Sequence, residues 1–320
     1  MRKILISITA ISVFLFLGCK SGSKKKLDLK GNITIATAEN TSAFIKNITG
    51  EFMKNYPNIK IDVIAMDADM YVESALLNEM INIGVITVNS AQSEAKRKIN
   101  SFCFAQDAVV GIVNSENQVV EALLNKGISK KEFENIFING NNVNWGSFGN
   151  SKNKDIVNTY IRGDECSDAE AWADFLGKKT ADLKGTKVVG GNNMLSAVEK
   201  DKSGIGYVGF NLAYASSTKY EKEGIKIIPI DKNENGILDD NENYTFRKDS
   251  ILKAIFQGRY PHALTEDILI ITKKEKADDI TSELIKWVLT DGQAFINEAG
   301  FAKASNNKIQ ESLNKFKKLK

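Results

Sequence analysis

Residues 32–64 read NITIATAENTSAFIKNITGEFMKNYPNIKIDVI and predict a strand, a helix and a second strand in that order. The strands at 32–37 and 59–64 are rich in isoleucine, valine and threonine, which favour extended backbone. A helix over 41–56 lies between them and ends before Pro57. Its apolar stripe consists of Phe44, Ile45, Ile48 and Phe52. This order is typical of an α/β fold.

The same alternation continues along the rest of the chain. A helix is predicted at 69–80 and leads into an apolar strand at 83–88. The strand at 108–113 has no polar alternation, which indicates burial on both faces. Two more helices are predicted at 168–176 and 193–199. A folded body of about 290 residues exceeds the size that one core usually supports, so we expect two α/β lobes.

The N-terminus has the pattern of an export signal. Two basic residues precede an uninterrupted apolar run over 4–17, which is followed by Gly18 and Cys19. The run is shorter than the roughly 20 residues of a membrane-spanning helix. We predict a signal peptide at 1–18, lipidation of Cys19 and a polar tether at 19–28, with an ordinary signal anchor as the alternative. The protein would then be an exported, membrane-anchored lipoprotein that faces the periplasm or the cell exterior.

Composition excludes several classes of function. Six of the 43 basic residues precede Asp28, the first acidic residue, which leaves 37 basic against 40 acidic residues in the body and gives no sign of nucleic-acid binding. His262 is the only histidine, so a histidine-based catalytic triad or a multi-histidine metal site is excluded. Apart from Cys19, only Cys103 and Cys166 are present, without metal-like spacing. We therefore predict a binding protein and not an enzyme.

Four predicted helices begin directly after a strand, at a cluster of polar residues. A helix start presents unpaired N–H groups and the positive end of the helix dipole, which suits an oxyanion. If the four starts converge, they form an anion site. The alternative is that these residues are ordinary N-caps. The clusters are Glu39-Asn40-Thr41-Ser42, Asp67-Ala68-Asp69, Cys166-Ser167-Asp168 and Gly190-Gly191-Asn192-Asn193.

Several longer segments occur in a characteristic order. They are FAQDAVVGIVN at 104–114, ISKKEFENIF at 128–137, VNW at 143–145, YIRGD at 160–164, SGIGYVG at 203–209 and GRYP at 258–261. Together they resemble the periplasmic phosphate-binding proteins of the Pst-type ABC transporter. The resemblance implies the α/β type II periplasmic-binding-protein fold, in which two lobes joined by two crossing segments close like a Venus flytrap around dehydrated phosphate.

The resemblance also implies a division of the chain. The crossings would fall near 104–107 and near 260–264. Lobe I would consist of 29–104 and 263–320, and lobe II of 105–262. Anion binding would close the lobes, and the closed form would be recognised by the permease.

On the lobe II side, Arg162 and Asp164 match the family's Arg-x-Asp pair. The resemblance implies that the guanidinium holds two phosphate oxygens while the carboxylate orients it. The alternative is an arginine that pairs only with Asp164. The family's following Gly-Ser-Gly-Thr is replaced here, which brings Cys166, Ser167 and Asp168 to the predicted ligand site.

On the lobe I side, Asn40 and Thr41 inherit the family's phosphate-facing positions. Asp69 replaces a hydroxyl donor, and Asn89 is the equivalent of an Asp or Arg. An ionised carboxylate that faces a dianion is strongly unfavourable. Asp69 and Asp168 are therefore expected to cap their own helices. Alternatively they are protonated acceptors of a phosphate proton, or the ligand is not phosphate.

A second motif resembles a calcium-binding loop. Residues 231–242 read DKNENGILDDNE, which fits the pattern D-x-N-x-N-G with a glutamate at the twelfth position. The predicted ligands are Asp231, Asn233, Asn235, Ile237 and Glu242. A strand-like segment at 225–230 precedes the loop where a helix is usual, so an Asx-rich surface turn is the alternative.

The predicted function is a substrate-binding lipoprotein of an ABC importer that captures inorganic phosphate. Its partners would be phosphate, the permease subunits and the membrane, with no nucleic acid, no cofactor other than calcium, and a monomeric state. The alternatives are sulfate, tungstate or a phosphorylated metabolite as ligand, or a surface lipoprotein used for adhesion or sensing. An enzyme is disfavoured because a plausible pair of nucleophile and base is missing.

Overall fold

The computed structural model describes residues 29–66, 69–89, 99–140, 143–149, 154–214, 220–244, 247–274 and 277–319. The predicted signal peptide, the lipidation site Cys19 and most of the tether lie outside the described residues. Among the helices that are described, none is long and apolar enough to cross a membrane.

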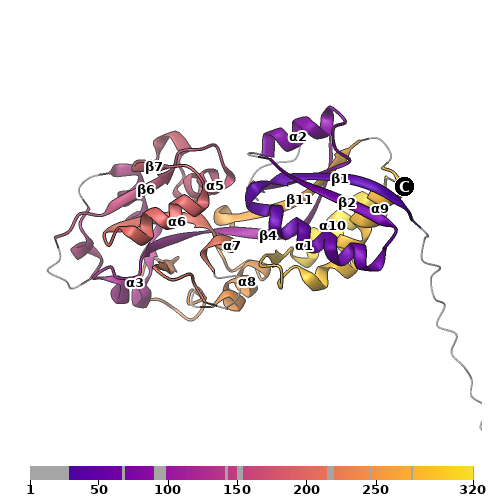
Figure 1. The fold of residues 1–320 in the computed structure, drawn as a ribbon. Coiled ribbons are helices and arrows are strands. Elements are labelled where there is room, and N and C mark those ends of the chain that lie inside the picture. The colour runs from indigo at the N-terminus through magenta and orange to yellow at the C-terminus, as the bar shows by residue number, and fades with distance from the viewer. Residues whose placement is uncertain are drawn as a thin grey trace, which may run out of the picture.

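Two α/β lobes lie side by side and share one long strand (Figure 1). This strand, β4 (Ile99–Asn114), pairs with β11 (Thr265–Lys273) along its first part and with β8 (Gly204–Gly209) along its second part. The strands are ordered β2-β1-β3-β11-β4-β8-β6-β7. The predicted fold class is confirmed, because the two lobes are α/β units joined at a crossing.

Lobe I is built around a sheet with three parallel strands. β1 (Gly31–Ala38) pairs with β2 (Ile59–Met66) and β3 (Ile83–Asn89), and β11 runs antiparallel to β3. The sheet is covered by α1 (Glu39–Asn55), α2 (Asp69–Leu77), α9 (Asp279–Leu289) and α10 (Asn306–Lys317), and β12 (Ala302–Lys303) pairs with β4. The predicted stripe of α1 is buried in the lobe I core.

Lobe II contains shorter elements around β8. The parallel strands β6 (Asn158–Arg162), β7 (Thr186–Val188) and β8 are accompanied by β9 (Ile225–Ile227) and by the pair β5 (Ile128–Ser129) and β10 (Ile230–Asp231). The helices are α3 (Val120–Lys126), α4 (Lys130–Glu134), α5 (Ser167–Leu176), α6 (Gly191–Lys200), α7 (Phe210–Ala213) and α8 (Lys248–Phe256). Trp172 packs against Phe133, Phe137 and Tyr207 at the centre.

Several predicted elements differ from the structure in their bounds, and three of them illustrate the reasons. The helix predicted at 69–80 ends at Leu77, because Glu79 has a positive φ of 61° that breaks the helical path. The strand predicted at 108–113 is the second part of β4, which begins nine residues earlier, at Ile99. Helix α1 begins at Glu39, two residues before the prediction.

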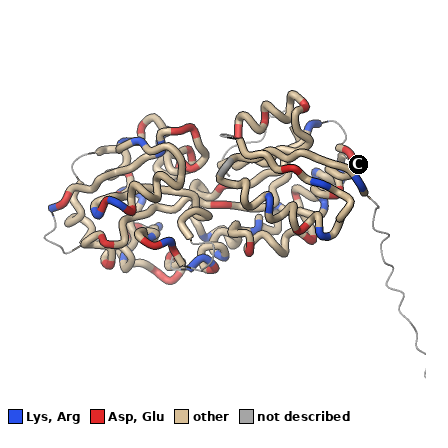
Figure 2. Tube along the Cα trace, viewed as in Figure 1, with Lys and Arg blue, Asp and Glu red and all other residues tan. Residues whose placement is uncertain are grey.

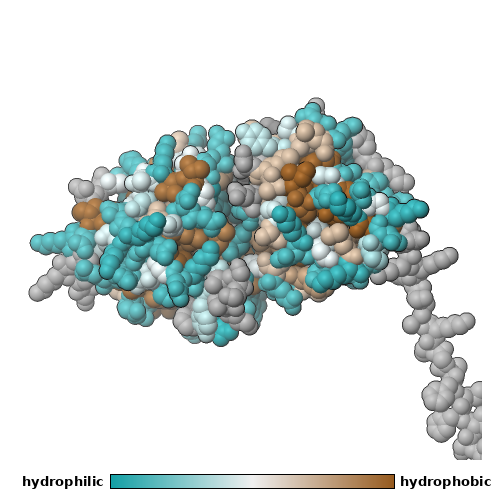
Figure 3. All heavy atoms as spheres, in the orientation of Figure 1, coloured by the Kyte–Doolittle hydropathy of each residue, from teal (hydrophilic) through white to brown (hydrophobic). Residues whose placement is uncertain are grey.

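The apolar cores lie on either side of the crossing. One core contains residues between Ala108 and Leu264, joined by Ala302. A second contains residues from Ile33 to Ala105 and from Ile268 to Phe316, and a third, smaller cluster of the same lobe contains residues between Ala36 and Ala304. Basic and acidic positions are interspersed over both lobes (Figure 2). The visible surface is largely hydrophilic, with hydrophobic residues in small separate patches (Figure 3).

Candidate ligand-binding site

A cavity of about 440 Å³ is lined by the first residues of α1, α2, α5 and α6, and so by residues of both lobes. Its lining consists of Ala38, Asn40, Ala43, Asp69, Arg162, Asp164, Glu165, Cys166, Ser167, Asp168, Gly190, Gly191, Asn192, Asn193 and Leu212. Each of the four polar clusters that the sequence placed at helix starts therefore contributes at least one residue to this cavity. Their meeting satisfies the geometric condition for an anion site.

Three of these helix starts receive no side-chain cap hydrogen bond, and in two of them, α1 and α6, the N-cap residue has no polar side chain. The N-cap residues are Ala38 for α1 and Gly190 for α6, and neither helix receives a side-chain cap hydrogen bond. By contrast, Asp278 and Ser305 accept backbone N–H groups at the starts of α9 and α10. The interpretation of the clusters as ordinary N-caps is therefore wrong for α1 and α6, whose first N–H groups stay available to a ligand.

The third start, that of α5, has a thiol at the N-cap position. Cys166 makes no cap hydrogen bond, although its thiol lies near the N–H of Ala169. Burial raises the pKa of Cys166, so this side chain stays a neutral thiol at ordinary pH. Neither Cys166 nor the buried Cys103 is part of a disulfide.

Arg162 lies at the end of β6 and its side chain is only 8% exposed. Its Nε donates to Oδ1 of Asp164 at 2.8 Å, and its Nη2 donates to Oδ2 of the same carboxylate. Its Nη1 donates to Oδ2 of Asp168 at 2.9 Å. The interpretation of an arginine paired only with Asp164 is therefore wrong. These bonds use three of the five guanidinium N–H groups and leave two for a ligand.

Arg162 and its carboxylate partners shift one another's pKa values. Burial alone would raise the pKa of Asp164, but the hydrogen bonds and the charge of Arg162 hold it below its ordinary value. The pKa of Arg162 is raised in turn by its carboxylate partners, against the opposite effect of its burial. Arg162 is therefore a permanent cation with a fixed orientation.

Asp168 is buried, with 4% of its surface exposed. Its Oδ2 accepts from Arg162 and also from the N–H of Gly209 at 3.2 Å. The expectation that Asp168 caps its own helix is thus wrong, because the buried guanidinium is the stronger partner. Burial raises the pKa of Asp168, and Arg162 opposes this increase. Asp69, at the start of α2, accepts from the N–H of Thr87 at 3.2 Å.

Two predicted site residues do not line the cavity, contrary to expectation. The Oγ1 of Thr41 lies 2.6 Å from that of Thr37 and donates to the carbonyl of Ala38 at 3.1 Å. Asn89 is buried and donates to Oδ2 of Asp174 on α5 at 2.7 Å. Nearby backbone and carboxylate acceptors take these donors, so Thr41 stabilises the start of α1 and Asn89 joins the two lobes.

Two buried carboxyl groups near the cavity were not predicted. Asp107 on β4 and Glu266 on β11 are directly paired in the antiparallel register and are 4% and 1% exposed. Burial raises the pKa of Asp107 to about 8, and the charge of Asp168 adds to this. Burial, Asp168 and Asp107 raise the pKa of Glu266 well above its ordinary value. An aspartate within the apolar run 104–114 was the signal that could have revealed Asp107.

The cavity is acidic overall. Arg162 is the one basic side chain among its described lining residues, against the four carboxyl groups of Asp69, Asp164, Glu165 and Asp168. A desolvated dianion would be repelled by such a set if all four carboxyl groups were ionised. The helix starts and Arg162 are the features that favour an anion, and the protonation of the acids decides how strongly they do so.

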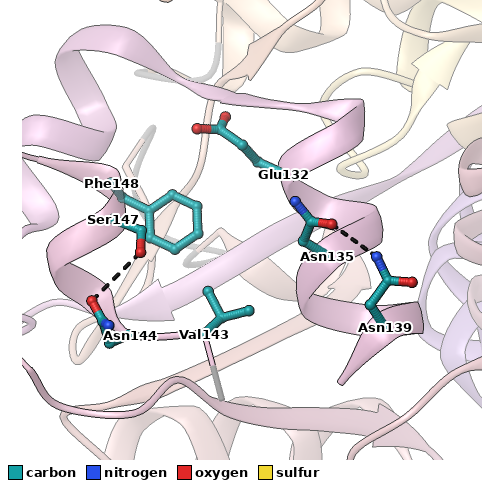
Figure 4. A pocket seen from close by; sticks show the side chains of 7 residues that line it. All are labelled: Glu132, Asn135, Asn139, Val143, Asn144, Ser147 and Phe148. Atoms are coloured by element: carbon teal, nitrogen blue, oxygen red, sulfur yellow. Dashed lines mark hydrogen bonds between the residues drawn. The ribbon is translucent and has the colours of Figure 1, made fainter. Parts of the chain in front are cut away.

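A second cavity, of about 330 Å³, lies within lobe II (Figure 4). Asn135 and Asn139 are hydrogen-bonded at 2.8 Å on its one side, and Ser147 and Asn144 at 3.4 Å on the other. The described residues that line it include no basic side chain. This cavity is therefore a poorer match to an anion than the one between the lobes.

The 231–242 loop forms a tight turn held by its own backbone. Asp231 accepts from the N–H of Gly236 at 2.8 Å, and Gly236 has a φ of +77°. Glu242 accepts from the N–H of Lys232 at 2.9 Å. Within the described part of the chain, no group of three or more His, Cys, Asp or Glu side chains is arranged to hold a metal ion. Calcium binding by this loop stays a prediction.

Fold and cavity together define a two-lobed ligand-binding protein. The PBP superfamily domain matches residues 23–292, and the chain belongs to this superfamily. Phosphate-binding protein PstS of Staphylococcus haemolyticus is 24% identical over 335 residues, which cover 98% of this chain and 96% of the relative. PstS of Staphylococcus aureus strain USA300 is 24% identical over 332 residues, with 98% and 91% covered.

Solved structures agree with the fold. A Clostridium perfringens protein, described as a phosphate ABC transporter substrate-binding protein and solved with bound phosphate, has a TM-score of 0.63 at 16% identity and covers 86% of this chain and 100% of its own. An ABC-type phosphate transport receptor from Vibrio cholerae has a TM-score of 0.59 at 16% identity and covers 84% and 99%. The family resemblance is confirmed, and these relatives are binding proteins rather than enzymes, as predicted.

Proposed function

We propose that this protein is the oxyanion receptor of an ABC importer and that inorganic phosphate is its ligand. The observation that carries the proposal is the meeting of four helix starts and Arg162 at one cavity between the lobes. The PstS names of the relatives support phosphate as the first ligand to test. Sulfate, tungstate or a phosphorylated metabolite are the alternatives, because a shared fold does not determine the ligand.

In this proposal the phosphate oxygens accept hydrogen bonds from two sources. The uncapped starts of α1 and α6 supply backbone N–H groups with the positive ends of their dipoles. Arg162 supplies the two N–H groups that Asp164 and Asp168 leave unused. Neither source needs a catalytic group, which suits a protein that binds and releases its ligand unchanged.

Closure of the lobes would complete the site. Lobe I (29–104 and 263–320) and lobe II (105–262) would move about the crossing that contains β4 and the start of β11. Two hydrogen bonds between the lobes would stabilise the closed arrangement. They run from Asn89 to Asp174 at 2.7 Å and from Asn211 to the carbonyl of Asn40 at 3.3 Å. The permease would recognise the closed form, which the bound anion stabilises.

The sequence supports an exported, monomeric lipoprotein attached to the membrane through Cys19. Metabolic labelling with an alkyne-tagged fatty acid tests this. The chain should incorporate the label, Cys19→Ser should abolish it, and Cys103→Ser, a variant of a buried thiol, should retain it. Labelling of Cys19→Ser would contradict the lipoprotein assignment.

The ligand is tested by calorimetric titration of protein that has been unfolded and refolded to remove any carried-over anion. We expect phosphate to bind with a Kd in the micromolar range or tighter, while sulfate and tungstate give weaker or no heat. No binding of any of the three to protein that circular dichroism shows to be folded would contradict the oxyanion receptor and favour a surface role in adhesion or sensing.

Calcium at the 231–242 loop is a separate proposal. The tight turn at Gly236 and the sequence of oxygen ligands support it. Thermal unfolding with 1 mM calcium should then occur at a higher temperature than with a chelator, and Asp231→Ala should remove the difference. An equal Tm in both conditions would leave the loop as an Asx-rich turn.

A further inference from the structure

Asp168 accepts from one of the Arg162 donors at the cavity and places a carboxylate beside the two N–H groups left for a ligand. The Nη1 group of Arg162 donates to this carboxylate at 2.9 Å, and the N–H of Gly209 donates to the same oxygen at 3.2 Å. Asp164 already takes the other edge of the guanidinium. A ligand oxygen must therefore compete with an internal carboxylate for the only cation among the cavity's described lining residues.

A pair of buried carboxyl groups lies beside Asp168. Asp107 and Glu266 are directly opposite each other on β4 and β11, and side chains so paired lie on the same face of the sheet. A Cβ added to Gly209 would be 3.5 Å from an oxygen of Asp107 and 3.5 Å from an oxygen of Asp168. Three buried carboxyl groups thus lie around one point of the crossing, and they cannot all be ionised there.

The titratable and charged groups that face Asp168 are Arg162, Asp164, Cys166, Tyr207, Asp107 and Glu266. Only Arg162 among them favours the ionised form of Asp168. Lys248 acts from α8 on Asp107, and Asp69 acts from α2 on Glu266. Burial and the charge of Asp164 raise the pKa of Asp168, against the opposite effects of Arg162 and of the N–H of Gly209.

We propose that Asp168 is a specificity-determining residue that competes with anionic ligands for Arg162, so that the cavity binds an oxyanion together with one proton. The inference rests on the proposed function as an oxyanion receptor. The proton comes from solvent and joins the carboxylate of Asp168. The neutral carboxyl group no longer repels the anion, and the Nη1 group of Arg162 becomes available to a ligand oxygen.

This coupling has a definite sign. Where Asp168 is ionised in the free protein, each binding event takes up a proton, so anion affinity falls as pH rises. An asparagine keeps the size of the side chain and an oxygen acceptor for Arg162 but carries no charge. Asp168→Asn should therefore bind anions well at high pH and lose the proton uptake.

The test is calorimetric titration of the purified full chain with phosphate at pH 6 and pH 8, in buffers of different ionisation enthalpy. These buffers report the protons taken up per phosphate bound. Phosphate's own protons contribute equally to wild type and Asp168→Asn, so the difference between them isolates the protein's proton. Asp62→Asn, a variant of an exposed carboxylate on β2, is the matched control.

We expect Asp168→Asn to bind phosphate about tenfold more tightly than wild type at pH 8, with a difference below about threefold at pH 6. Wild type should take up close to one proton more than the variant at pH 8. Equal affinity and equal proton uptake would overturn the inference and leave the receptor function in place. Binding by the variant alone would show that Asp168 excludes phosphate at both pH values, and it would overturn both proton-coupled binding by wild type and its receptor function.

Two further measurements keep the test decisive. If neither protein binds phosphate, sulfate or tungstate at either pH, Asp168 is not what excludes anions, and both the inference and the receptor function fail. If Asp168→Asn does not fold, the pH dependence of wild type still decides. A wild-type phosphate affinity that falls from pH 6 to pH 8 by more than the ionisation of phosphate itself explains supports the inference, and an affinity that follows phosphate ionisation alone overturns it.

Discussion

The two walls of the cavity come from different lobes and differ in chemistry. The lobe II wall contains Arg162 and the starts of α5 and α6, so it combines a fixed cation with backbone N–H groups. The described lobe I wall consists of the starts of α1 and α2, with Asn40 and Asp69 and no basic residue. From this difference we infer that contacts with lobe II contribute most of the binding free energy. Lobe I would then close over an anion that lobe II has already bound.

The largest effect on phosphate affinity is expected from replacing Arg162. A small effect would contradict the assignment of most of the binding free energy to the lobe II wall. Arg162→Ala removes charge-assisted hydrogen bonds worth about 1.5–3 kcal/mol each, so phosphate affinity should fall about a thousandfold in calorimetric titration. Arg162→Lys keeps the charge without the fork and should lose at least about tenfold.

Arg259→Ala serves as the control, because Arg259 lies outside the cavity lining and contacts Tyr244. Its phosphate affinity should equal that of wild type. An Arg162→Ala variant that is folded and binds phosphate as wild type does would show that the helix starts alone hold the anion.

The buried carboxyl groups at the crossing between the two lobes should make the free energy of unfolding depend on pH. Folding raises the pKa of Asp107 from an ordinary 3.8 to about 8, so the folded state binds more protons than the unfolded state within this window. The contribution of Asp107 to stability is therefore greatest at low pH and decreases as pH rises towards 8. Between pH 5 and 7, the free energy of unfolding should decrease by about 2–3 kcal/mol from this group.

Asp107→Asn should remove that part of the decrease in denaturant unfolding measured at both pH values. The remaining decrease would come from Glu266 and Asp168, whose raised pKa values act in the same direction. An increase of wild-type stability from pH 5 to 7 would contradict the buried, protonated state of Asp107.

A moderate effect is expected on the lobe I wall. Asn40→Asp places a carboxylate at the start of α1, and phosphate affinity should fall about tenfold by repulsion. Asn47→Asp, on an exposed face of the same helix, is the matched control and should change affinity less than twofold. Equal effects of the two substitutions would mean that the lobe I wall does not face the anion.

The smallest effect concerns the contact between the walls. Asp174→Ala removes the acceptor of the Asn89 side chain, and it should weaken phosphate binding about threefold by favouring the open lobes. Small-angle scattering should show a larger radius of gyration for the phosphate-bound variant than for phosphate-bound wild type at equal saturation. Tighter binding by this variant would argue that the contact holds an unproductive state.

Local patterns predicted much of the fold and part of the candidate site. The stripe from Phe44 to Phe52 specified α1, because helical spacing of apolar residues requires one buried face. The Arg-x-Asp pair also formed as expected, since Arg162 and Asp164 are neighbours in sequence. The hydroxyl of Thr41 and the amide of Asn89 were misplaced, because a side chain with several acceptors in reach chooses its partner by tertiary geometry.

Residues close together along the chain are enough to specify the α/β class, the polar helix starts and the presence of one strong cation. Asp107 and Glu266 are 159 positions apart and are paired at the crossing only through the strand pairing of the folded chain, which also brings Asp168 to Arg162. Strand register and burial determine which of these side chains lie close together. Burial also determines the protonation state of the carboxyl groups, and so the charge that an anion encounters.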